Sequence, residues 1–137
     1  MDLSLSLFGS CSETHNIVSL FANIEHKKRL PPEPQTGNVE YKLKLINPSK
    51  NRLEHLITQL NWRLHEGRGK AIYEIGVEDN GVLKGLSEEE MSNSLDTLEI
   101  MAMKLGAKTQ IIKEYILDSG KKIVEVLITM SLREINL

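Results

Sequence analysis

The chain has 137 residues, of which 40% are hydrophobic and 4% aromatic, enough for one domain with flanking tails. A formal net charge of −2 gives no global positive field for nucleic acid, and a single cysteine, Cys11, excludes a disulfide framework and a cysteine-based zinc site. No run approaches the ~20 apolar residues of a membrane helix, and the N-terminus lacks the pattern of a signal peptide. These features predict a small cytoplasmic α+β protein that binds no membrane.

The first 37 residues are predicted to be a flexible N-terminal tail and proline-rich linker. A short amphipathic helix is expected over residues 13–22. Pro31, Pro32 and Pro34 then remove backbone donors and favour an extended linker. The folded module is predicted to cover residues 38–130, followed by a C-terminal tail over residues 131–137.

The module begins with a strand and a helix. Apolar and polar residues alternate from Val39 to Leu45, which is typical of a half-buried strand. Residues 51–66 then follow a helical period. One stripe of that helix is apolar and contains Leu53, Leu56, Ile57, Leu60 and Leu64. Gly67 ends the helix.

A hairpin and a second helix are expected next. Ile72–Val77 is a β-branched run that predicts a buried strand. Asn80-Gly81 favours a type I′ turn into a return strand over Val82–Leu86. Ser87 and Glu90 have the spacing of a capping box, and Gly106 is a natural stop for the helix they start.

The C-terminal part is predicted to be a closing hairpin of residues 109–117 and 122–130, joined by a turn at residues 118–120. The resulting order is β-α-β-β-α-β-β. We therefore expect an α+β fold in which two helices cover one face of a mixed β-sheet.

The sequence predicts no catalytic, cofactor-binding or metal-binding residue. Gly69-Lys70 and Gly120-Lys121 lack the upstream glycine and the following Ser or Thr of a P-loop. The four histidines have no metal-ligand spacing. Residues 78–80, Glu-Asp-Asn, leave open an autonomous small enzyme with an acidic site, although turn geometry explains the same residues.

The strongest candidate surface is the outer face of the first predicted helix. Residues 39–69 carry a net charge of +3 within a chain of −2. The only tryptophan, Trp62, lies opposite the apolar stripe. Polar or basic residues surround it in the sequence and complete the candidate surface: Arg52, His55, Gln59, Arg63 and Arg68. An exposed aromatic with guanidinium neighbours suits RNA or ribosome contact, contact with a partner domain, or packing within the chain.

Longer motifs resemble the region before the GTPase domain in the GTP-binding protein 1/2 family, and the N-terminal residues are similar to its GTP-binding protein 2 branch. These motifs are VEYKLKLINPS at residues 39–49, QLNWRL at 59–64, EGRG at 66–69 and IGVEDNG at 75–81. A shorter similarity links residues 75–86 to Schlafen-type AlbA-like domains.

The resemblance implies a translational GTPase similar to elongation factor 1-alpha, with GTP and magnesium as cofactors of full-length relatives. No position here matches the family's nucleotide-binding motifs, so none of those residues is carried over. We expect the chain to be a non-catalytic N-terminal module, present as a truncated product, an isoform or an incomplete gene model. Its expected partners are the ribosome, RNA or a GTPase domain; an intramolecular docking role that regulates the GTPase domain is the alternative.

Overall fold

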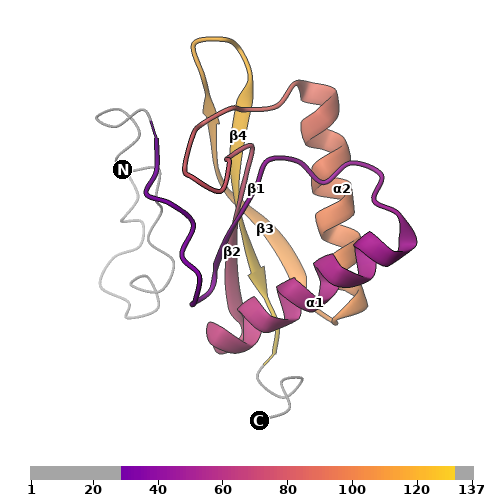
Figure 1. Cartoon of the computed structure of the whole chain (residues 1–137). Helices are drawn as coiled ribbons and strands as arrows, with labels where there is room; N and C mark the ends of the chain where they lie inside the picture. Colours follow the sequence, from indigo (N-terminus) through magenta and orange to yellow (C-terminus); the bar gives the residue numbers. More distant parts are fainter. Residues whose placement is uncertain (1–28, 132–137) are drawn as a thin grey trace.

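The computed structural model describes residues 29–131, in which both helices lie on one face of a four-stranded mixed sheet (Figure 1). The predicted helix over residues 13–22 and the residues after 131 lie outside this range. The elements in chain order are β1 (Val39–Lys42), α1 (Lys50–Glu66), β2 (Lys70–Ile75), α2 (Glu88–Lys104), β3 (Lys108–Ile116) and β4 (Lys122–Thr129). The expected α+β class is confirmed.

The sheet order is β1-β2-β4-β3. β1 and β2 are parallel because α1 carries the chain back to the start of the sheet, whereas β2–β4 and β3–β4 are antiparallel. β3 is therefore an edge strand although it is adjacent in sequence to the central strand β4. It contains a bulge between Ile111 and Lys113.

Local signals start and stop the helices as expected. The Ser49 hydroxyl accepts the Arg52 N–H at the start of α1. Ser87 and Glu90 form the complete capping box at the start of α2, and Gly106 follows that helix with φ +73°. Neither helix of the described residues is long and apolar enough to cross a membrane.

The main core lies between the helices and the sheet. Alternate residues of β2 and β4 face the helices, as the period of two requires. This layer contains Leu56, Leu60 and Leu64 of α1, Met91, Leu98 and Met101 of α2, and Tyr73, Ile75, Val124, Val126 and Ile128 of the strands. A smaller cluster of Leu30, Tyr41, Val77 and Ile123 lies on the opposite face.

The predicted return strand over Val82–Leu86 is wrong. Its residues form isolated bridges to three different segments: Val82 pairs with Arg29, Leu83 with Val77, and Leu86 with Lys122. One strand cannot form a continuous ladder with partners in three directions. The order therefore has four strands, not five.

The turn before this segment also differs from the predicted type I′. Among the described residues only two non-glycines, Asn47 and Arg68, have positive φ, so Asn80 does not adopt the conformation that a type I′ turn needs. Gly81 N–H instead bonds the Glu78 carbonyl, and Glu78 N–H bonds the Val82 carbonyl. This is a three-residue loop with Gly81, at φ +94°, as its bulge residue.

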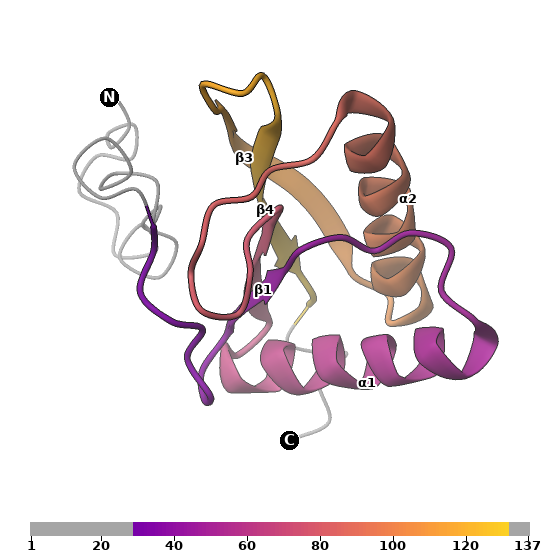
Figure 2. The same cartoon turned by 45° about the horizontal axis from the view of Figure 1, so that its top comes forward.

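The proline-rich segment lies against the sheet. We call residues Leu30–Pro34 the strap. Its backbone donates from Leu30 to Gly81 O and from Glu33 to Asp79 O, and the Tyr41 hydroxyl donates to Pro31 O. The linker expected from these prolines is thus a hydrogen-bonded part of the fold from residue 29 onward (Figure 2, indigo).

Candidate interaction surface on the first helix

Trp62 lies on the side of α1 away from the main core. Leu56, Leu60 and Leu64 of the same helix are buried against the sheet, whereas Trp62 is 43% exposed. Residues three or four apart share one side of a helix, as Leu56, Leu60 and Leu64 do. Trp62 is two residues from both Leu60 and Leu64, so it points to the opposite side. The structure therefore leaves a large aromatic surface accessible on α1.

Arg63 has a different environment from the one expected for a contact residue. Only 4% of it is exposed. Its Nε donates to Glu40 Oε1 of β1 at 2.7 Å, and its two terminal nitrogens donate to the carbonyls of Gly37 and Pro34 at 2.9 Å. The expectation of a free guanidinium at this position is corrected: Arg63 binds α1 to β1 and to the end of the strap.

Arg63 also positions Trp62. The guanidinium carbon lies 4.9 Å from the centroid of the indole, which is the geometry of a cation–π contact. Because three hydrogen bonds fix the guanidinium, the indole stacks on a rigid support. The indole of Trp62 is therefore held at the surface by the side chain of Arg63, which is itself buried.

The other predicted surface residues are exposed but less closely grouped. His55 and Gln59 precede Trp62 by seven and three residues, so they share its side of α1. Arg52 is exposed in the first turn, about 15 Å along the helix axis from Trp62. Arg68 is exposed in the loop after the helix, with φ +54°. We call Arg52, His55, Gln59 and Trp62 the Trp62 face.

Glu40 and the strap differ from what the sequence pattern indicates. The alternation from Val39 to Leu45 predicts a solvent-facing Glu40, but Glu40 is 4% exposed and also pairs with Lys42 at 3.2 Å. The sequence offers one hint of the ion pair between Glu40 and Arg63: a carboxylate stands in the strand before a helix whose last turn is basic. The contact joins residues 23 positions apart, so no local pattern identifies it.

Glu33 of the strap is the most perturbed carboxyl near this surface. Burial raises the pKa of Glu33 to about 7, and the carboxylates of Glu40 and Asp79 act in the same direction. The N–H of Tyr41 donates to Glu33 Oε2 at 2.6 Å and opposes that rise. The strap therefore carries a group that titrates near neutral pH.

The alternative acidic site at residues 78–80 forms a turn. Asp79 and Asn80 are exposed, and the Asn80 side chain accepts the Val82 N–H. Asp79 O binds the strap. Within residues 29–131, no group of three or more His, Cys, Asp or Glu side chains is arranged to hold a metal ion.

The fold and this surface define a small α+β module with a rigid aromatic group on one helix. No family model matches the chain, and no solved structure matches it. By sequence it is homologous to the GTP-binding protein 1/2 family, which confirms the resemblance found in the motifs. It is 59% identical over 103 residues to human GTP-binding protein 2, covering 72% of this chain.

Two other relatives are less similar to this chain. GTP-binding protein 1 of Xenopus laevis is 34% identical over 94 residues, which covers 69% of this chain. An uncharacterized protein of Acanthamoeba polyphaga mimivirus is 29% identical over 97 residues. The chain spans 17% of human GTP-binding protein 2, 14% of the Xenopus protein and 52% of the viral protein.

Proposed function

We propose that this chain is a non-catalytic docking module of a GTP-binding protein and that its Trp62 face contacts the GTPase domain of such a protein. The observation that carries the proposal is the stacked indole of Trp62, which is 43% exposed on a guanidinium fixed by three hydrogen bonds. Aromatic side chains held rigid at a surface are common hot spots of protein interfaces.

The varied length of the relatives supports a separable module. The matched stretch makes up 17% of human GTP-binding protein 2 but 52% of the viral protein. A module that occurs in chains of such different lengths is suited to a binding role that does not depend on the rest of the chain. GTP hydrolysis and a cytoplasmic location belong to this proposal as properties of the whole protein.

The experiment is a binding titration between the 137-residue chain and human GTP-binding protein 2 from which the matching stretch has been removed. Trp62→Ala is expected to weaken binding about 30-fold, the effect of losing a hot-spot tryptophan. Ile100→Ala is the matched control, because Ile100 of α2 is also 43% exposed. Equal binding by both variants would overturn the proposal.

A second candidate function is contact with RNA on the ribosome, as expected for a translational factor. The exposed cations of Arg52 and Arg68 on either side of Trp62 favour it. The electrostatic argument for RNA contact is weaker than the sequence indicates, because Glu40 neutralises the third guanidinium, that of Arg63. Salt-dependent co-sedimentation with ribosomes, lost in Arg52→Ala/Arg68→Ala but retained in Lys104→Ala, would select this function over docking on a GTPase domain.

The chain also allows a direct test of catalysis. GTP hydrolysis by the purified 137 residues, abolished by Asp79→Asn, would favour the autonomous enzyme with an acidic site at residues 78–80. We expect no turnover above buffer.

A further inference from the structure

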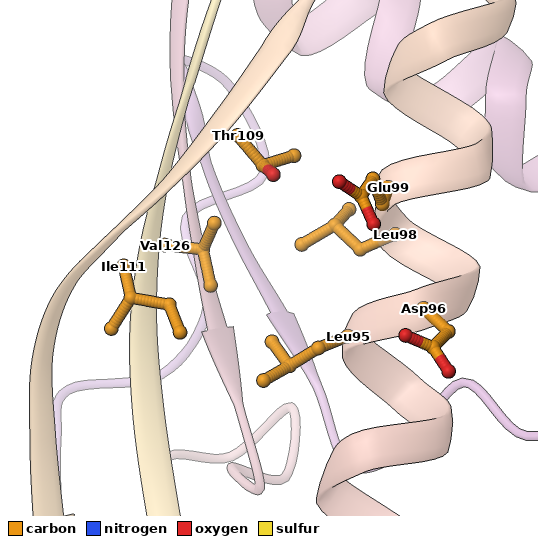
Figure 3. A pocket seen from close by; sticks show the side chains of 7 residues that line it. All are labelled: Leu95, Asp96, Leu98, Glu99, Thr109, Ile111 and Val126. Atoms are coloured by element: carbon orange, nitrogen blue, oxygen red, sulfur yellow. The ribbon is translucent and has the colours of Figure 1, made fainter.

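A groove lies between α2 and the edge strand β3, on a different helix from the Trp62 face. It has a volume of about 300 Å³. Figure 3 shows Leu95 and Leu98 pointing from α2 toward Val126 and Ile111 on the strands. The remaining lining residues are polar: Asp96, Glu99 and Thr109. The floor is thus apolar and the helix side of the rim is acidic.

No cation from residues 29–131 pairs with the acidic rim. Among the described residues, neither Asp96 nor Glu99 takes part in an ion pair. The whole of α2 carries five carboxylates, three of them in its first turn, against one ammonium, Lys104. A cationic side chain that enters the groove would therefore meet unneutralised negative charge beside an apolar floor.

The strand side of the groove presents open main-chain groups. β3 pairs only with β4 in the described sheet, so its outer N–H and C=O groups have no strand partner. The bulge between Ile111 and Lys113 interrupts the edge in its middle. The stretch from Lys108 to Ile111 precedes the bulge and is regular, and its Thr109 and Ile111 line the groove.

Exposed apolar side chains continue this surface. Ile111 is 46% exposed in the groove, and Met103 is 68% exposed on α2 one turn beyond Glu99. Large apolar side chains beside an unpaired strand edge form a surface that another chain can cover, because the free N–H and C=O groups of the edge can pair with a further strand. The combination of open edge, apolar floor and acidic rim specifies one type of occupant.

We propose that the groove between α2 and β3 binds an extended peptide segment of a partner protein whose α2-facing positions, every second residue, alternate between apolar and basic side chains. The segment adds to Lys108–Ile111 as a further strand, its apolar side chains enter the groove beside Leu95 and Ile111, and a Lys or Arg meets Asp96 and Glu99. Main-chain pairing supplies affinity and the side chains supply specificity. This site is independent of the Trp62 face.

The test uses a capped seven-residue peptide with valine at positions 1 and 5, lysine at positions 3 and 7 and threonine between them, so that valine and lysine share one face of the strand. It is titrated into the isotope-labelled 137-residue chain and followed by amide NMR shifts. We expect shifts at Lys108–Ile111 and along α2. A matched peptide with glutamate in place of lysine should bind at least tenfold more weakly, because it places like charges together.

Two variants locate the charge contact. Asp96→Asn/Glu99→Gln should weaken the lysine peptide about tenfold, whereas Glu89→Gln, on the same helix outside the groove, should leave it unchanged. Both exchange exposed carboxylates for amides, and unchanged thermal unfolding verifies the fold. Equal binding of the two peptides, shifts elsewhere on the molecule, or a concentration-dependent dimer that shifts the same amides without peptide would overturn the proposal.

Discussion

Arg63 of α1 and Glu40 of β1 form a buried ion pair, with side chains only 4% and 5% exposed and 2.7 Å between Nε and Oε1. The pair joins the helix that carries Trp62 to the edge of the sheet. The same guanidinium binds Pro34 and Gly37 and stacks on the indole. One side chain therefore links the strap, the sheet and the candidate interaction surface.

Arg63→Met is expected to destabilise the protein strongly, by about 3–5 kcal/mol, because it leaves the Glu40 carboxylate buried without its main partner. The free energy of unfolding in urea measures the loss. Glu40→Gln/Arg63→Met should recover part of it, because the double variant has no uncompensated buried charge at this pair. Arg52→Ala is the control: Arg52 is exposed, so the change should stay within about 0.5 kcal/mol. An Arg63→Met variant as stable as the parent would contradict the structural role of the ion pair.

Stability should fall as the pH rises from about 4.5 to 7. Burial raises the pKa of Glu33 from 4.5 to about 7, so in this range the folded state holds a proton that the unfolded state has released. Burial, with Glu125 beside it, also raises the pKa of Glu74 well above 4.5 and acts in the same direction.

Glu33→Gln tests the contribution of the strap. The amide oxygen can still accept the Tyr41 N–H but does not titrate, so the variant should lose less stability than the parent between pH 5 and pH 8. Urea unfolding at these two pH values gives the comparison, with the exposed Glu54→Gln as control. An unchanged pH dependence in Glu33→Gln would be incompatible with this role.

Gly81→Ala should disrupt the attachment of the strap. A Cβ there would lie 2.0 Å from the Leu30 carbonyl oxygen, and φ is +94°. We expect a loss of more than about 2 kcal/mol, combining the clash with the left-handed strain of about 1–2 kcal/mol. Gly120→Ala separates these causes, since φ there is +88° but a Cβ has nothing within 4 Å. Thermal and urea unfolding should show a smaller loss at Gly120; equal losses would mean that the strap contact contributes nothing.

Ser87→Ala should cost about 1 kcal/mol, because it removes the side-chain half of the capping box of α2. The Glu90 carboxylate would still accept a hydrogen bond from the backbone N–H of residue 87, so part of the cap remains. Urea unfolding measures the cost. Ser92→Ala, at an exposed position inside the same helix, should be neutral or slightly stabilising. A larger loss of stability in Ser92→Ala than in Ser87→Ala would refute the role of the cap.

The local elements follow from the amino-acid sequence alone. Both helices, the cap at Ser87, the stop at Gly106 and the β3–β4 hairpin depend on contacts within a few residues, so periodicity and turn chemistry identify them. The exposure of Trp62 follows from the same periodicity. The long motifs likewise identified the family, because a run of specific residues needs no structure to be compared.

The remaining features depend on contacts between segments that are far apart in the sequence. Arg63 lies at the border of the apolar stripe of its helix, and its burial depends on a carboxylate that β1 brings beside it from 23 residues away. The residues after Gly81 would suit a strand, but three competing partners divide them. The prolines of the strap lack donors for a ladder, yet their carbonyls accept from Tyr41 and Arg63. In each case, pairing between distant segments overrides the local preference, because burial and charge compensation outweigh propensities of a fraction of a kcal/mol.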